Sequence, residues 1–444
     1  MSDAPRAGGR PETPGGVDPE GKSVLVLGLG VTGRELARVL AKRGAHVLAS
    51  DSGVVGDISV PGVDIEQGSH DRARKRLGEF DLIVPSPGIS PMRGFLAEII
   101  EGGATITSEL DIAQAMTSAT IVAITGTNGK TTVVRAAERI AREAGFDAYA
   151  CGNTETPFIT SVEEHPDADL FIVECSSFRL AFCRSFHPRV AAITNFAPDH
   201  LDWHRDLADY RASKARIAAR QQRSDLFLYP SSQTELADLA PPDGPRRRAF
   251  GAETIGVSSG AISTLAAHGE HFVADAAAAA AAMSFLGADR PAIERGLTGF
   301  QPDPHRLDLV GHYNGARVYD DAVSANVNAT LAALRTFDDP IVLIAGGRNK
   351  GLDLAPLATE ASRLRALIAI GEAAPELERV FSDSAVFVSI APSMREAVGM
   401  ALEAARKGDV VLLSPACASF DMFDGYADRG RQFLDACREL GVRS

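Results

Sequence analysis

The sequence predicts three α/β domains in series. Along the 444-residue chain, apolar strand-like runs alternate with glycine-rich turns and helical segments, a pattern typical of parallel sheets covered by helices. The length favours two to four domains, because a single hydrophobic core stops growing well below this size. We expect domains at residues 21–108, 109–302 and 303–444, after a disordered Pro- and Gly-rich tail at residues 1–20.

The first domain begins with a strand, a glycine-rich turn and a helix. Residues 24–27 form an apolar strand that leads into the G-x-G-x-x-G sequence of residues 28–33. A second strand, residues 46–51, ends at Asp51, and a third covers residues 81–84. This pattern is typical of a Rossmann-like, dinucleotide-binding βαβ unit.

The second domain carries a phosphate-binding loop. Residues 126–132, G-T-N-G-K-T-T, follow the apolar strand of residues 121–124 and precede a helical segment. Glycines let backbone N–H groups surround phosphate oxygens, Lys130 supplies a positive charge, and the Thr131 hydroxyl can bind Mg²⁺. Ile124 stands where the longer G-x-x-x-x-G-K-[ST] pattern has its first glycine, so the loop is a shortened form. We expect a P-loop ATPase-like domain that uses a nucleoside triphosphate.

Polar side chains follow the next strands of this domain. Glu174 ends one strand, where a carboxylate can hold Mg²⁺ opposite Thr131. His200 lies in the loop after the next strand, and Lys214 follows it. A strand-end glutamate is more often a cap and a loop histidine more often structural, but their place after a phosphate loop favours metal or phosphate contact.

The third, Rossmann-like domain presents further polar strand ends. Arg306 lies just after the interdomain linker, where it can reach a nucleotide in the second domain. Asp321 follows a strand, and Lys350 belongs to a Gly-rich strand exit. Residues 414–421 form a small-residue turn that we expect to open a helix and to bind a carboxylate through backbone N–H groups.

Composition excludes several classes of protein. A net charge of −13 disfavours general nucleic-acid or membrane binding, and the five cysteines lack the C-x-x-C spacing of zinc sites. With no apolar run near 18 residues, we expect a cytoplasmic, monomeric protein that acts on small molecules. Residues 246–248, three arginines, should lie in a solvated loop, and the alanine run of residues 275–283 should form a buried helix.

The combined motifs resemble the Mur ligases, and among them the D-glutamate-adding, or MurD, type. They are T-G-T-N-G-K-T-T, E-C-S-S-F, D-H-L-D-W-H followed by Y-R-A-S-K, H-R-L, and L-L-S-P-A-C-A-S-F-D-M-F, within a resemblance that covers residues 21–444. The resemblance implies an ATP-dependent ligase of cytoplasmic peptidoglycan precursor synthesis. It joins D-glutamate to UDP-N-acetylmuramoyl-L-alanine through an acyl phosphate, with two Mg²⁺ ions.

Matched positions carry the implied roles. The implied catalytic residues are Lys130, Glu174, His200 and Lys214. Contacts to metal ions are implied at Thr131, Glu174, His200 and Lys214. Lys214 also matches the lysine that is carbamylated in the family. Nucleotide contacts are implied at Gly126, Thr127, Asn128, Gly129, Lys130, Thr131, Thr132, Asp275, Arg306 and Asp321. Substrate contacts are implied for the UDP-sugar at Thr32, Asp51, Ser52, Ser86, Gly88 and Asn153, and for the amino acid at Lys350, Ser419 and Tyr426.

The chain departs from this pattern at three positions. Val323 and Ala325 stand where the family has Lys and Thr beside the incoming amino acid, and Asp275 replaces an Asn near the adenine site. A ligase for another amino acid, such as L-glutamate, is therefore an open alternative. Two further alternatives are open. One is an NAD-dependent oxidoreductase, based on residues 28–33 and Asp51, and the other is a catalytically silent nucleotide-binding protein.

Overall fold

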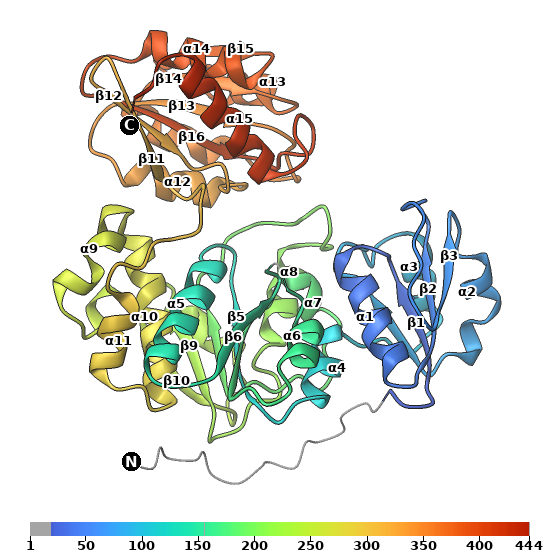
Figure 1. The fold of residues 1–444 in the computed structure, drawn as a ribbon. Coiled ribbons are helices and arrows are strands. Elements are labelled where there is room, and N and C mark those ends of the chain that lie inside the picture. Colours follow the sequence, from blue (N-terminus) through green and yellow to red (C-terminus); the bar gives the residue numbers. More distant parts are fainter. Residues whose placement is uncertain (1–18, 155, 444) are drawn as a thin grey trace.

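The computed structural model describes residues 19–154 and 156–443 and contains three α/β units, each built around its own sheet (Figure 1). The predicted α/β class with mostly parallel sheets is confirmed. The predicted domain boundaries stay predictions. Of the tail predicted at residues 1–20, residues 1–18 lie outside the described part of the chain.

The N-terminal sheet is parallel throughout, in the order β3-β2-β1-β4. Its turn after β1 requires glycine, because a Cβ on Gly33 would lie 1.9 Å from the carbonyl oxygen of Gly28. Strand β3 is not among the predicted strands, since polar residues interrupt this short edge strand. The elements are β1 (Ser23–Leu27), α1 (Val31–Lys42), β2 (His46–Asp51), β3 (Val63–Gln67), α2 (Asp71–Lys75), β4 (Leu82–Pro85) and α3 (Gly94–Glu101).

The central sheet has six parallel strands in the order β10-β9-β8-β5-β7-β6. Its strands are β5 (Thr120–Thr125), β6 (Ala148–Gly152), β7 (Leu170–Glu174), β8 (Val190–Ile193), β9 (Leu226–Pro230) and β10 (Arg246–Phe250). Its helices are α4 (Glu109–Ala115), α5 (Lys130–Glu143), α6 (Phe158–Glu164), α7 (Ser177–Leu180), α8 (Leu207–Ala215), α9 (Ser259–Ala267), α10 (Glu270–Phe285) and α11 (Arg290–Leu297).

The arginines of residues 246–248 do not lie in a loop, so that prediction is wrong. They begin β10, which pairs with β9 at the edge of the sheet, and all three are exposed. Long charged side chains suit an edge strand because they disfavour pairing with another chain.

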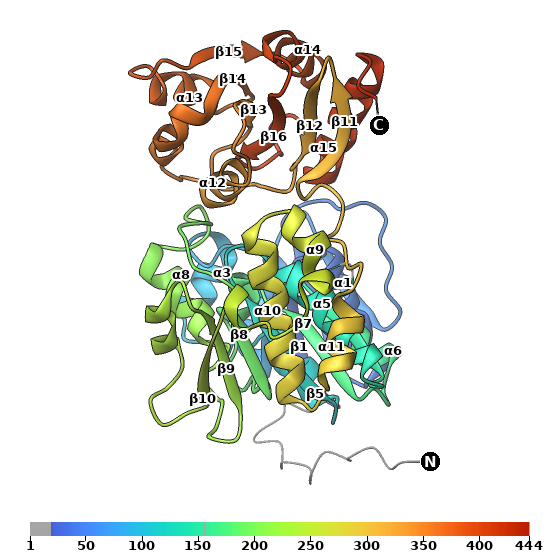
Figure 2. The same cartoon turned by 90° about the vertical axis from the view of Figure 1, so that its left-hand side faces the viewer.

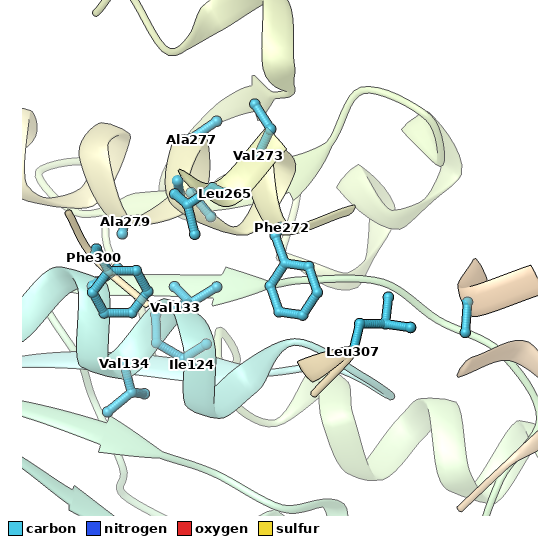
Figure 3. Close-up of a cluster of buried hydrophobic side chains, with 14 of the residues drawn as sticks. Ile124, Val133, Val134, Leu265, Phe272, Val273, Ala277, Ala279, Phe300 and Leu307 are labelled. Atoms are coloured by element: carbon cyan, nitrogen blue, oxygen red, sulfur yellow. The ribbon is translucent and has the colours of Figure 1, made fainter. Parts of the chain in front are cut away.

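The alanine run forms the predicted buried helix. Residues 276–280 of α10 are buried against α5 and the sheet, in a cluster that includes Val133, Leu265 and Phe272 (Figure 3). Alanine side chains let the two helices approach closely. Leu307, from the segment that leads to the C-terminal unit, lies in the same cluster, so this core continues toward the third unit.

The C-terminal sheet has the order β11-β12-β16-β13-β14-β15, and β11 is its one antiparallel strand. Its strands are β11 (Asp308–Tyr313), β12 (Ala316–Asp320), β13 (Ile341–Gly346), β14 (Leu364–Ile370), β15 (Phe387–Ala391) and β16 (Val410–Ala416). Its helices are α12 (Val327–Arg335), α13 (Ala374–Val380), α14 (Met394–Ala404) and α15 (Tyr426–Glu439). Short 3-10 helices lie at Leu77–Glu79, Thr234–Leu239, Ala252–Thr254 and Ala355–Arg363.

One predicted helix start is wrong. Residues 414–421 do not open a helix, because turns separate the end of β16 from α15, which begins at Tyr426. In both views the C-terminal unit stands over the central unit with α12 on the facing side (Figures 1 and 2). Among the described residues, no helix is both long and apolar enough to span a membrane.

Candidate active site

The phosphate loop joins β5 to α5 as predicted. Gly126 has a φ of 147° and Gly129 a φ of 81°. A Cβ on Gly126 would lie 1.8 Å from the hydroxyl oxygen of Thr194. Both positions therefore require glycine, and the loop presents its backbone N–H groups and the start of α5 to one side, an arrangement that binds phosphate.

Two lysines converge on this loop. Lys130 Nζ donates to the carbonyl oxygens of Gly126 (3.0 Å) and Thr127 (2.9 Å), and Lys214 Nζ donates to that of Gly126 (2.7 Å). Helix α8, which carries Lys214, is capped by Asp206, whose side chain accepts from the backbone N–H of Asp209. Burial lowers the pKa of both lysines, and that of Lys214 falls well below its usual value, also because of the Lys130 charge. The neutral form of the Lys214 amine is therefore less costly here than in an exposed lysine.

Glu174 ends β7 beside the loop and is 3% exposed. Its Oε1 accepts from Asn153 Nδ2 at 3.4 Å, whereas its buried Oε2 has no hydrogen-bond partner among the described residues. The hydroxyl of Thr132 is likewise buried without a partner, and Thr131 is half-buried. A free carboxylate oxygen on the strand that pairs with β5, which leads into the phosphate loop, suits Mg²⁺, which takes few protein ligands and completes its shell with phosphate and water. Within the described ranges, no three His, Cys, Asp or Glu residues form a metal cage of their own.

His200 lies in the loop after β8 with a left-handed φ of 56°. Its ring packs edge-on against Phe178, and burial lowers its pKa to about 3, so the imidazole is neutral at physiological pH. The neighbouring Asp199 is 3% exposed and forms an ion pair with Lys350 of the C-terminal unit. Burial raises the pKa of Asp199, but its interactions with His200 and the charge and hydrogen bond of Lys350 outweigh burial and hold the pKa below its usual value. This ion pair joins the central and C-terminal units at the loop.

Asp275 reaches the loop from α10. A Cβ on Gly129 would lie 2.3 Å from Asp275 Oδ1, so the carboxyl group packs directly against the loop. Burial raises the pKa of Asp275 to about 7, although the charges of Arg306 and Lys130 act to lower it. An acid that is half protonated near neutral pH therefore lies at the expected phosphate site.

Arg306 lies between two residues in the left-handed region, His305 (φ 69°) and Leu307 (φ 56°). Its charge acts on Asp275 and also on Asp321. Asp321 is buried, accepts from Ser414 Oγ at 2.7 Å, and has its pKa raised by burial to about 7. The predicted nucleotide residues of the second and third units thus lie close enough to influence one another.

A cavity of about 580 Å³ opens in the N-terminal unit. It is lined by Asp51, Ser52 and Gly88, three of the residues predicted to contact the UDP-sugar, and by Asp202 and Trp203 from the central unit. Asp51 Oδ2 also accepts from the backbone of the glycine-rich turn.

The other three predicted UDP-sugar residues do not line this cavity. Thr32 Oγ1 accepts from Arg179 Nη2 at 3.0 Å, and Ser86 Oγ donates to the Gly28 carbonyl at 3.1 Å. Asn153 contacts the carboxylate that ends β7.

The cavity is also lined by residues that were not predicted as site residues, among them His70, Arg74 and Arg93. His70 lies in the loop after β3. Because that strand was not predicted, nothing in the sequence marked the loop as the place of a site residue. Arg93 lies at the start of α3, and a single exposed arginine has no motif that would mark it.

The predicted amino-acid residues lie on three different elements. Lys350 follows β13, Ser419 is buried after β16, and Tyr426 is the half-exposed first residue of α15. Val323 lies in the loop after β12, where its N–H donates to the carbonyl of His305 at 3.3 Å. Arg429, fully buried beneath these loops, was not predicted, because an arginine within a helix is normally exposed.

Comparisons with family models cover the second and third units. Residues 124–288 match the Mur ligase middle domain, and residues 305–417 match the Mur ligase glutamate ligase domain. Among solved structures, the chain resembles a MurF ligase from Thermotoga maritima in complex with ADP. That match has a TM-score of 0.58 at 15% identity and covers 95% of this chain and 96% of the other. MurC from the same organism gives a TM-score of 0.56 at 15% identity, over 95% of this chain and 100% of the other.

Curated relatives match over nearly their full length. A protein of Pelotomaculum thermopropionicum named UDP-N-acetylmuramoylalanine--D-glutamate ligase is 35% identical, over 94% of this chain and 98% of the relative. A protein of Chlorobaculum parvum with the same name is also 35% identical, over 95% and 98%. The resemblance carried by the motifs is thereby confirmed, and the chain belongs to the Mur ligase family.

Proposed function

We propose that this protein is a cytoplasmic, ATP-dependent ligase that joins D-glutamate to UDP-N-acetylmuramoyl-L-alanine in peptidoglycan precursor synthesis. The observation that carries the proposal is the phosphate loop with Lys130, Lys214 and the free Oε2 of Glu174, facing the strand ends of the C-terminal unit. The D-glutamate ligases of two other organisms, which match over nearly the whole chain, support the same assignment. The proposed domains are residues 21–108 for the UDP-sugar, 109–302 for ATP and 303–444 for the amino acid.

In the proposed reaction the loop and Lys130 hold the ATP phosphates. The carboxylate of the UDP-linked substrate attacks the γ-phosphorus, ADP leaves, and an acyl phosphate forms. The amine of glutamate then attacks the acyl carbon, phosphate leaves, and the amide remains after the amine loses a proton. Positioning and charge neutralisation by Lys130 and its neighbours supply most of the acceleration in such phosphoryl transfers.

Mg²⁺ would be held by Glu174 Oε2 and the Thr131 hydroxyl, and His200 would help to hold or orient a second ion. Bound there, it would neutralise phosphate charge. Lys214 would serve this site after carbamylation. Its lowered pKa favours the neutral amine, which adds CO₂ and loses a proton to give a carbamate anion.

A second candidate is the same reaction with another amino acid, such as L-glutamate. It is favoured by Val323 and Ala325, which provide neither the cation nor the hydroxyl expected beside D-glutamate. The oxidoreductase alternative assigns no role to Lys130, Lys214 or the phosphate loop, and family membership argues against it.

The test is ATP-dependent phosphate release with UDP-N-acetylmuramoyl-L-alanine and a panel of D- and L-amino acids. We expect release to require the UDP-linked substrate and to be fastest with D-glutamate. Preference for L-glutamate would select the second candidate. Release that does not depend on the UDP-linked substrate would contradict both.

A further inference from the structure

Arg429 is the largest fully buried side chain in the described structure. It lies in the first turn of α15, three positions after Tyr426. Burial lowers the pKa of Arg429 to about 10, so the guanidinium still carries its charge at neutral pH. A buried cation is costly unless neighbouring groups or a ligand compensate it.

The guanidinium contacts three loops at the end of the sheet. Nη1 donates to the carbonyl of Cys417 at 3.0 Å, after β16, and Nη2 donates to that of Ala322 at 2.8 Å, after β12. A Cβ on Gly347, after β13, would lie 3.4 Å from Nη1. Nε is buried and has no hydrogen-bond partner in the part of the chain that the structure describes. Arg429 thus holds together the loops that follow β12, β13 and β16.

Each of these contacts is next to a residue expected at the amino-acid pocket. Ala322 precedes Val323, Cys417 lies two positions before Ser419, and Gly347 lies three positions before Lys350. A shift of the guanidinium would therefore displace all three sides of the pocket.

Nearby acids do not neutralise Arg429 by direct contact. In the described structure it forms no ion pair, and the acids whose charges act on it are Asp421, Asp320 and Asp321. Asp320 is bound to His305, and Asp321 accepts from Ser414. Asp421 Oδ2 accepts from the backbone of Glu372. The hydrogen-bond partners of the Arg429 guanidinium are thus backbone carbonyl oxygens of two loops and no carboxylate.

We propose that Arg429 is a positioning and specificity-determining residue for the incoming amino acid, holding the three pocket loops and favouring a substrate with a second carboxylate. The inference rests on the proposed ligase function. It gives this chain a source of positive charge at a pocket where Val323 provides none.

The test separates charge from shape by comparing D-glutamate with D-glutamine, its uncharged amide. In Arg429→Met we expect the KM for D-glutamate to rise about tenfold or more, the effect of losing a charge-assisted interaction. The KM for D-glutamine should change less than about twofold. Arg429→Lys, which keeps the charge but not the planar fork, should restore part of the preference. If D-glutamine is not turned over, its inhibition constant is measured in place of its KM. If L-glutamate is the substrate, the comparison is made between L-glutamate and L-glutamine.

An amino-acid-independent reaction provides the internal control. With ATP, ADP and UDP-N-acetylmuramoyl-L-alanine alone, reversible acyl-phosphate formation exchanges labelled ADP into ATP. This exchange should fall much less than ligation in Arg429→Met, because it needs no amino acid and Asp321, the neighbouring nucleotide residue, keeps its hydrogen bond from Ser414. The matched control is Arg438→Met, on the same helix but at the surface, which should change nothing.

Equal losses with D-glutamate and D-glutamine would overturn the specificity role. A fall in exchange that parallels the loss of ligation would overturn the positioning role. Absence of exchange in the unaltered protein would instead contradict the proposed function itself. If Arg429→Met does not fold, Asp421→Asn removes an acid that offsets the arginine, and it should lower the KM for D-glutamate about threefold. An unchanged or higher KM in that variant would overturn the inference.

Discussion

Asn326 Nδ2 of the C-terminal unit donates a 2.9 Å hydrogen bond to the side-chain oxygen of Asn128 in the phosphate loop. The same nitrogen donates to Asp199 Oδ2 at 3.1 Å, and Asn326 Oδ1 caps α12 by accepting from Ala329 N. The residue that caps α12 therefore also joins the central and C-terminal units, through two asparagines that are 198 positions apart along the chain.

Asn326→Ser should loosen this junction while keeping the helix cap, because serine caps helices well but is too short to reach Asn128. We expect a larger radius of gyration by small-angle X-ray scattering and a ligation kcat about tenfold lower, the cost of one or two hydrogen bonds. Asn328→Ser, two positions further along α12, is the control. An unchanged radius together with an unchanged kcat would show that the contact does not hold the units together.

Lys130→Ala should reduce ATP turnover by about two to three orders of magnitude, because a buried cation that stabilises phosphate charge is lost. Phosphate release and ADP–ATP exchange should fall together. Lys75→Ala, an exposed lysine of α2, is the control. Normal turnover in Lys130→Ala would contradict the enzyme assignment.

Asp275 should make ATP binding depend on pH. Its pKa of about 7 leaves it neutral in acid and negative in base, where it would repel phosphate. We expect the KM for ATP to rise several-fold from about pH 6 to about pH 8, and to rise much less in Asp275→Asn. Comparing the KM for ATP of Asp275→Asn with that of the unaltered protein at each pH removes the contribution of ATP's own ionisation.

The same group should affect stability. Its pKa in the folded chain lies above its usual value of 3.8, so the associated stabilisation is complete in acid and lost as the pH rises through about 7. The melting temperature should therefore fall between about pH 4 and about pH 7, and fall less in Asp275→Asn. Identical curves for the two proteins would show that Asp275 does not titrate in this range.

Val323→Lys with Ala325→Thr should strengthen D-glutamate binding if that is the substrate. A charge-assisted contact contributes about 1.5 to 3 kcal/mol, so the KM for D-glutamate should fall about tenfold or more. Steady-state ligation with D- and L-glutamate measures the change. A rise in KM for D-glutamate would show that the pocket is arranged for another amino acid.

Gly126→Ala should destabilise the central unit. Its Cβ would clash with the Thr194 hydroxyl, and the positive φ disfavours alanine. We expect a melting temperature lower by about 5 °C or more and no detectable ATP turnover. Gly78→Ala is the control, because a Cβ there would meet no atom within 4 Å.

Local sequence predicted the parts of the fold that depend on neighbouring residues. Apolar runs gave most of the strands, and the loop at residues 126–132 lies where a strand and a helix predicted it. Strand β3 was not predicted, and the arginines of β10 were assigned to a loop. In both cases an exposed edge strand lacks the continuous apolar run that identifies a buried one.

The site was predicted less completely, because it is built by contacts between distant segments. Motifs identified Lys130, Glu174 and Lys214, which the structure brings to one loop. Nothing in the sequence joined Asn326 to Asn128, since such pairing appears only when two units meet. Arg429 carried no signal either, because its burial depends on how α15 packs against three loops.

The two left-handed residues on either side of Arg306 have a mechanical consequence. The His305 ring is bound to Asp320 of the C-terminal unit, while the Leu307 side chain is buried in the core that includes Phe272 of α10. Arg306 is therefore held on both sides by residues anchored in different units. This anchoring fixes the place from which its guanidinium acts on Asp275 and Asp321.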